Sequence, residues 1–250
     1  SLRLLQTFDL EPNYNVTLLS LWDKRTLLCC SRWQGLLLLD LNTGKCRRPP
    51  FDCGKEIMNV LIDSQERIWV APYNGGLNCL TRDGKLLATY TTHNSSLSNN
   101  VILSLAEREG EIWIGTDGGG INILDPETRR FSLLEHMPGS DNYSLPANSI
   151  LCLYNDCNNN MWAGSIRNGL ISIREVSMKT YTDVPPGNDR GLSNNTVLSL
   201  FQESQDQIWV GTDGGGINSF NPLTEKFTHY PSTWEDKVAS ICQFTPGKLL

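Results

Sequence analysis

The sequence has no hydrophobic run that could cross a membrane as a helix. A membrane-spanning helix needs about 18 or more consecutive apolar residues, and the longest run here covers only residues 35–39. The first ten residues, SLRLLQTFDL, also lack the basic region and the long apolar core of a signal peptide. We therefore expect these 250 residues to be an interior segment of a longer protein.

The sequence also lacks the patterns that bind nucleic acid, metal ions or phosphate-bearing cofactors. Its net charge is −6, with acids and bases interspersed and no basic stripe, so nucleic acid is not an expected partner. The eight cysteines form no C-x-x-C pair and the histidines form no H-x-x-x-H pair, so no metal site is expected. The glycine-rich stretches lead into predicted strands rather than helices, so no phosphate-binding loop and no cofactor are expected.

Helical periodicity is missing as well. No window of a dozen residues has the spacing of an amphipathic helix. Short apolar runs bounded by polar or glycine-rich turns recur instead, which is the pattern of β-strands. The sequence therefore predicts an all-β protein.

One unit of two short strands around a glycine hairpin recurs along the chain. Its clearest copies are residues 111–126 (EIWIGTDGGGINILDP) and 207–222 (QIWVGTDGGGINSFNP), with weaker copies at 26–39, 67–80 and 160–173. The tryptophan of the unit recurs at Trp69, Trp113, Trp162 and Trp209. This period of roughly 40 to 50 residues is typical of propellers and solenoids.

The strands within each unit favour a propeller. An apolar strand precedes the tryptophan strand, and a third and a fourth strand follow the hairpin, so each unit reads as a four-stranded antiparallel blade with its first strand innermost. The sequence predicts a single partial β-propeller domain, 1–250, with about five and a half blades of a seven-bladed ring. Its units are 14–51, 56–92, 99–136, 147–183, 194–231 and the start of a further blade at 237–250.

Two recurring positions of the repeat, the glycine of the hairpin and the tryptophan, have a physical explanation. A glycine ends the hairpin in every copy, at Gly35, Gly76, Gly120, Gly169 and Gly216. This predicts a backbone conformation or a close approach that a Cβ atom would prevent. The tryptophan column is predicted to be buried between adjacent blades rather than to bind a ligand.

The repeated pattern W-x-G-T-x-x-G-G resembles the two-component regulator propeller repeat. The resemblance is clear in residues 101–131 and 197–230, moderate in 150–181 and weak in 16–51 and 57–90. It implies the periplasmic sensor region of hybrid two-component regulators of polysaccharide-digesting gut bacteria. In that family two consecutive seven-bladed propellers precede an immunoglobulin-like domain, a membrane helix, and cytoplasmic kinase and response-regulator domains.

The resemblance also implies partners. The full-length protein is expected to be a sensor histidine kinase that acts as a homodimer and meets the membrane only through segments downstream of this one. The ligand is expected to be an oligosaccharide breakdown product, whose signal passes to the cytoplasmic histidine kinase. This segment itself is not expected to be an enzyme.

The expected ligand site lies on the face that carries the hairpins between second and third strands. The strand order places the long blade-to-blade connections, 91–100, 135–148 and 184–195, on that same face, and loops on a rigid scaffold commonly carry function. Polar groups with two aromatic rings suit an oligosaccharide. The candidate residues are Trp33, Tyr73, Asn74, Asp117, Arg167 and Asp213.

Other interpretations of these residues stay open. An aspartate in a T-D-G-G turn is common turn chemistry, and Arg167 is either a solvated surface arginine or a partner for a uronate or a sulfate. Asp117 and Asp213 could form the carboxylate pair of a glycosidase, although duplication explains their equivalent positions. The alternatives to a sensor are therefore a protein-interaction scaffold and a propeller-fold polysaccharide lyase or glycosidase, and no catalytic residue is assigned.

Overall fold

The computed structural model describes residues 7–136, 144–174, 177–230, 237–245 and 248–249. In this part of the chain the secondary structure consists of β-strands β1 to β22. No helix that could cross a lipid bilayer occurs in the described ranges.

The strands form five four-stranded antiparallel sheets, which we number as blades in chain order. Blade 1 contains β1 (Leu18–Asp23), β2 (Thr26–Ser31), β3 (Gly35–Asp40) and β4 (Cys46–Arg47). Blade 2 contains β5 (Ile57–Ile62), β6 (Ile68–Pro72), β7 (Leu77–Leu80) and β8 (Leu86–Tyr90). Blade 3 contains β9 (Ile102–Arg108), β10 (Glu111–Thr116), β11 (Ile121–Asp125) and β12 (Arg130–Leu134).

The second half of the chain continues the series. Blade 4 contains β13 (Ile150–Asn155), β14 (Met161–Ser165), β15 (Leu170–Arg174) and β16 (Ser177–Tyr181). Blade 5 contains β17 (Val197–Ser204), β18 (Gln207–Thr212), β19 (Ile217–Asn221) and β20 (Lys226–Tyr230). A two-stranded sheet, β21 (Gln243–Thr245) with β22 (Lys248–Leu249), follows blade 5.

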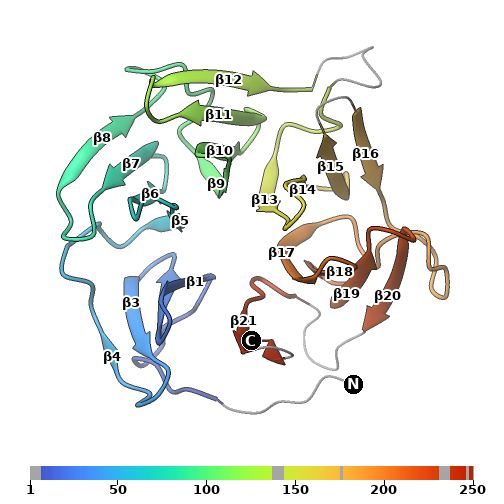
Figure 1. The fold of residues 1–250 in the computed structure, drawn as a ribbon, viewed down its shortest axis with the longest axis horizontal. Helices are drawn as coiled ribbons and strands as arrows, with labels where there is room; N and C mark the ends of the chain where they lie inside the picture. Colours follow the sequence, from blue (N-terminus) through green and yellow to red (C-terminus); the bar gives the residue numbers. More distant parts are fainter. Residues whose placement is uncertain (1–6, 137–143, 175–176, 231–236, 246–247, 250) are drawn as a thin grey trace.

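The sheets follow one another around a ring, with the first strand of each blade nearest the centre and the fourth at the rim (Figure 1). The predicted all-β propeller of four-stranded antiparallel blades is therefore confirmed. The predicted count of five and a half blades in a seven-bladed ring is not confirmed, because the described residues form five full blades and one two-stranded sheet. Residues 238–242, expected to start the next blade, form no strand.

The core consists of layers between neighbouring blades. Trp69 is 1% exposed and packs with residues of blade 3 such as Leu105 and Ile112. Trp113 (4% exposed) and Trp162 (1% exposed) likewise pack against blades 4 and 5. The predicted burial of these tryptophans between blades is confirmed, and each blade therefore depends on its neighbour for the burial of its largest side chain.

The inner strands are joined by side-chain bonds that run from each blade to the next. The third residue of the inner strand donates to a backbone carbonyl of the following repeat: Asn59 Nδ2 to Leu103 O (3.1 Å), Ser104 Oγ to Ile150 O (3.2 Å), and Ser199 Oγ to Val238 O (3.0 Å). Opposite the two serines the second strand carries a glycine, which leaves room for the hydroxyl group. A Cβ atom on Gly115 would lie 2.2 Å from Ser104 Oγ. The column therefore sets the spacing of the blades around the axis.

The segment 237–245, which follows blade 5, contacts blade 1 through the same column. Ser240 holds the equivalent position in the chain, and its Oγ accepts a hydrogen bond from the backbone N–H of Leu19 in β1 at 3.3 Å. Residues 237–245 therefore lie beside blade 1, as Figure 1 also shows.

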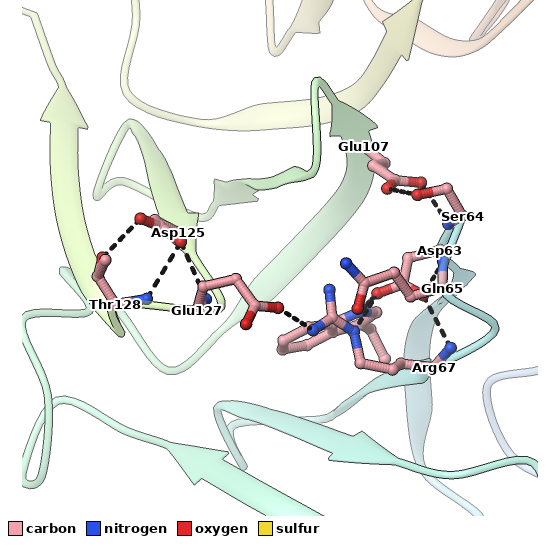
Figure 2. A network of polar contacts seen from close by, with 9 residues as sticks. Asp63, Ser64, Gln65, Arg67, Glu107, Asp125, Glu127 and Thr128 are labelled. Atoms are coloured by element: carbon pink, nitrogen blue, oxygen red, sulfur yellow. Dashed lines mark hydrogen bonds and ion pairs between the residues drawn. The ribbon is translucent and has the colours of Figure 1, made fainter.

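Ion pairs join blades 2 and 3 on the face of the short turns (Figure 2). Arg67 Nε donates to Asp63 Oδ2 at 2.6 Å within blade 2, and its Nη1 reaches Glu127 of blade 3 at 3.3 Å. Glu107 of blade 3 in turn accepts the backbone N–H of Ser64 at 2.7 Å. Arg67 and Glu107 thus each join blade 2 to blade 3.

Candidate functional site

The hairpins between second and third strands lie against the connections between blades, as the strand order predicts. In blades 2, 3 and 4 the last glycine of the hairpin donates its N–H to an asparagine carbonyl in the connection to the next blade: Gly76 to Asn100 (3.1 Å), Gly120 to Asn148 (2.8 Å) and Gly169 to Asn195 (3.0 Å). We call this surface, formed by hairpin residues 31–35, 72–76, 116–120, 165–169 and 212–216 with the adjoining connections, the hairpin face. Of the expected connection at 135–148, residues 137–143 lie outside the described residues.

The glycine column is required by both conformation and space. Gly76, Gly120 and Gly169 have φ of 71°, 72° and 73°, a left-handed conformation that favours glycine. A Cβ atom at each would lie 2.2, 2.3 or 2.1 Å from the carbonyl oxygen of the last residue of the fourth strand. The hairpins are therefore held rigidly against the ends of the outer strands, which fixes the positions of their tips.

The structure brings Trp33 and Tyr73 together around an arginine. The Arg32 guanidinium lies 5.1 Å from the ring centroid of Trp33 and 5.3 Å from that of Tyr73. Both rings remain open to solvent, Trp33 at 60% and Tyr73 at 48% exposure. Arg32 was one of the variable tip positions of the sequence but not one of the six candidate residues, because its contact with Tyr73 depends on how blade 2 packs beside blade 1.

Asn74 and Arg167 occupy the same hairpin position in blades 2 and 4. Their φ values are 52° and 66°, where the equivalent glycines Gly118 and Gly214 have 87° and 96°. Asparagine tolerates this region well, whereas arginine is uncommon in it. Arg167 is exposed at its tip, and it lies two blades away from the cluster of Trp33 and Tyr73.

Asp117 and Asp213 each contact a residue at the start of the following repeat. Asp117 Oδ1 accepts a hydrogen bond from Ser149 Oγ at 2.9 Å, and Asp213 Oδ2 lies 3.5 Å from Lys237 Nζ. No hydrogen bond joins the two aspartates to each other in the described part of the chain. These contacts join each aspartate to the repeat that follows it.

A cavity of about 600 Å³ adjoins the hairpin of blade 1. Gln34 and Gly35 of the hairpin line one side, and Arg48, Asp52 and Lys55 lie among the residues of the other sides. The cavity therefore extends the hairpin face beside Trp33 with a surface that carries two basic side chains.

The nucleophilic and metal-binding groups of the described residues do not gather into a centre. No group of three or more His, Cys, Asp or Glu side chains that could hold a metal ion occurs in the ranges that the structure describes. All eight cysteines are free thiols. Burial raises the pKa of Cys152 to about 12 and that of Cys53 to about 11, so these thiols are protonated at neutral pH and weak nucleophiles.

Two stretches of the chain, residues 96–118 and 191–214, match the family model described as two component regulator propeller. These are two-component regulator propeller repeats. Each matched repeat begins in the connection between blades, contains the first two strands of blade 3 or blade 5, and ends in the hairpin. The two matched stretches thus include parts of the hairpin face.

The solved structures that resemble the chain share its fold. A protein of unknown function from Bacteroides thetaiotaomicron has 11% identity and a TM-score of 0.66 over 94% of this chain and 66% of its own. The computationally designed Ika8 protein has 15% identity and a TM-score of 0.56 over 91% of this chain and 65% of its own. No curated protein matches the chain.

A third structure is the extracellular domain of the hybrid two component system BT3049 from B. thetaiotaomicron. It has 25% identity and a TM-score of 0.45 over 92% of this chain. The chain covers only 29% of that structure and less than two thirds of the lengths of the other two.

Proposed function

We propose that this chain is the extracytoplasmic, ligand-sensing propeller of a hybrid two-component signalling protein. The observation that carries the proposal is the presence of two-component regulator propeller repeats at 96–118 and 191–214. In this proposal the chain lies in the periplasm, the complete protein is a homodimeric sensor histidine kinase anchored by other segments, and the ligand is an oligosaccharide released from a polysaccharide. A seven-bladed ring in the complete protein is part of the same proposal.

The hairpin face is the ligand surface in this proposal. Its tips are fixed by the glycine column, and they present exposed aromatic rings beside polar groups, which suits the apolar faces and hydroxyl groups of sugars. Trp33, Tyr73 and Asn74 form one part of the surface and Arg167 another. Asp117 and Asp213 accept hydrogen bonds from the ligand through their carboxylate oxygen atoms while they stay in contact with Ser149 and Lys237.

A ligand on this surface has a physical route to the rest of the ring. The hairpins of blades 2, 3 and 4 are hydrogen-bonded to the connections that lead into the next blade, and the side-chain column joins the inner strands of blades 2, 3 and 4. A ligand that prefers one arrangement of these hairpins therefore shifts the population of that arrangement. The shift would reach other segments of the complete protein through the packed blades.

Thermal unfolding with a panel of plant and host oligosaccharides tests the proposal. A ligand present at 100 times its Kd stabilises the folded state by about 2.7 kcal/mol, which raises the Tm by about 5–10 °C for a chain of this size. The double variant Trp33→Ala with Tyr73→Ala serves as the control, since it should abolish the rise. Cleavage of the oligosaccharides during the incubation would instead support an enzyme, and no rise with any member of the panel would contradict the sensing of oligosaccharides.

A further inference from the structure

The cluster of Arg32, Trp33 and Tyr73 spans two blades of the hairpin face. Arg32 and Trp33 belong to the hairpin of blade 1, and Tyr73 belongs to the hairpin of blade 2. The guanidinium of Arg32 lies within cation–π distance of both rings, at 5.1 and 5.3 Å from their centroids. The cluster is therefore a preformed arrangement of one cation and two solvent-exposed rings.

Arg32 has no acidic partner among the described residues, unlike Arg48 and Arg67, which also lie over aromatic rings. Arg67 lies over the ring of Trp69 but is paired with Asp63 at 2.6 Å. Arg48 lies over Tyr14 and is paired with Glu11. The Nε atom of Arg32 is buried and has no hydrogen-bond partner in the described part of the chain. Because the chain covers this Nε, an acceptor from outside binds Arg32 through the terminal nitrogens of the guanidinium, which lies beside two exposed rings.

The surroundings of Arg32 suit an anion although the chain as a whole is acidic, with a net charge of −6. The hairpins of blades 1 and 2, SRWQG at 31–35 and PYNGG at 72–76, contain no acid, whereas those of blades 3 and 5 carry Asp117 and Asp213. The adjoining cavity of about 600 Å³ is lined by Lys55, by Asp52 and by Arg48, which is paired with Glu11. The two hairpins that form this cluster therefore carry no acidic side chain that would repel an anion.

We propose that Arg32 binds the acidic group, a carboxylate or a sulfate, of an anionic oligosaccharide whose sugar rings lie against Trp33 and Tyr73. The planar guanidinium matches both groups with two parallel hydrogen bonds, and aromatic rings provide the stacking surface that a sugar ring needs. The cavity beside Gln34 has room for a neighbouring sugar unit. This inference rests on the proposed function, because it names the chemical class of the oligosaccharide that the propeller senses.

Calorimetric titration of the 250-residue chain with three probes tests the inference. Tetragalacturonate carries carboxylates, its fully methyl-esterified form keeps the rings without the charge, and a sulfated carrageenan tetrasaccharide carries sulfates without carboxylates. We expect at least one acidic probe to bind at least tenfold more tightly than the methyl ester. The acidic probe that binds better identifies the group as a carboxylate or a sulfate.

Substitutions of Arg32 decide whether this residue makes the distinction. Arg32→Gln should weaken the binding of the acidic probe by about tenfold or more, as expected for the loss of a charged hydrogen bond, and should leave the methyl ester unaffected. The affinity of Arg32→Lys for the acidic probe should lie between that of the parent and that of Arg32→Gln, because lysine keeps the charge without the planar guanidinium group. Arg108→Gln is the matched control: Arg108 lies 5.6 Å over Trp113 and its Nε also has no partner in the described part of the chain, but Trp113 is only 4% exposed. This control should bind all probes as the parent does.

The outcomes separate this inference from the proposed function. Equal affinity for tetragalacturonate and its methyl ester, or an Arg32→Gln variant that binds the acidic probe unchanged, would overturn the acidic subsite and leave an oligosaccharide sensor intact. If no oligosaccharide binds in this titration or in the thermal panel, both the subsite and the sensing of oligosaccharides are wrong.

Discussion

The indole Nε1–H of Trp69 donates a hydrogen bond to Oδ2 of Asp63, six residues earlier in the chain, at 2.8 Å. The equivalent acid before Trp113 is Glu107, but its carboxylate accepts from Ser64 of the preceding blade instead (Figure 2). The Nε1 of Trp113 is consequently buried with no hydrogen-bond partner in the described part of the chain. Two tryptophans with the same place in the repeat therefore differ in whether their polar atom contributes to stability.

This difference predicts unequal effects of the same substitution. Trp69→Phe removes a donor from the buried carboxylate of Asp63 and should lower the free energy of unfolding by about 1–2 kcal/mol more than Trp113→Phe does. Trp113→Phe loses only part of its packing, because its N–H has no partner to lose. Urea unfolding of both variants measures the difference, and equal losses would show that the bond to Asp63 contributes nothing.

Replacing a tryptophan of this column by alanine should destabilise the protein far more than replacing it by phenylalanine. Trp113→Ala removes a side chain that is 4% exposed between blades 3 and 4, and it should destabilise the protein by about 3–5 kcal/mol. Trp33→Ala, at a ring that is 60% exposed, is the control and should change the stability by less than about 0.5 kcal/mol. If the Trp113→Ala variant melts like the parent, the tryptophan column does not hold the blades together.

Two glycines of one hairpin allow conformation and close approach to be separated. Gly118 (φ 87°) has no atom within 4 Å of a Cβ, so Gly118→Ala should cost only the left-handed conformation, about 1–2 kcal/mol. Gly120→Ala should cost about 1–3 kcal/mol more, because its Cβ would lie 2.3 Å from the carbonyl oxygen of Leu134. Chemical denaturation compares the pair, and indistinguishable variants would mean that the hairpin moves to accept the Cβ.

The left-handed backbone conformation at position 167 costs alanine about as much as arginine. The substitution Arg167→Ala therefore tests the contribution of the side chain to binding alone. Arg167→Ala keeps a non-glycine residue at φ of 66° and removes an exposed side chain, so the Tm of the ligand-free protein should not change. If Arg167 contacts the ligand, the affinity for an oligosaccharide that stabilises the parent should fall by about tenfold. Unchanged affinity in a calorimetric titration would remove Arg167 from the site.

The cysteines should differ sharply in their reaction with iodoacetamide. Cys157 is exposed, whereas Cys152 is buried and burial raises its pKa to about 12. Because the thiolate is the reacting form, Cys157 should be alkylated in the native protein and Cys152 only after unfolding. Peptide mass spectrometry follows the two sites, with Cys157→Ser as the control. Early alkylation of Cys152 would show that the inner strand of blade 4 opens readily.

The amino-acid sequence was sufficient for the class of fold and for the local shape of the blades. The period of the tryptophan, the alternation of strands and turns, and the glycine at the end of each hairpin are local patterns, and each repeats. Repetition made them readable, because every blade must solve the same packing problem with the same residue types. The burial of Trp69, Trp113 and Trp162 followed for the same reason.

The tertiary structure decided what lies between blades. That Arg32 sits between Trp33 of its own blade and Tyr73 of the next depends on the distance and rotation between two sheets, which no local pattern records. The contact of Ser240 with Leu19 joins residues 221 positions apart, and the bonds of Asp117 and Asp213 to the following repeat were hidden for the same reason. The sequence by itself therefore determined the four-stranded structure of each blade, because the hydrogen bonds and side-chain contacts within a blade join strands that are adjacent in the chain. Only the packed ring determined the candidate site, because its groups come from neighbouring blades.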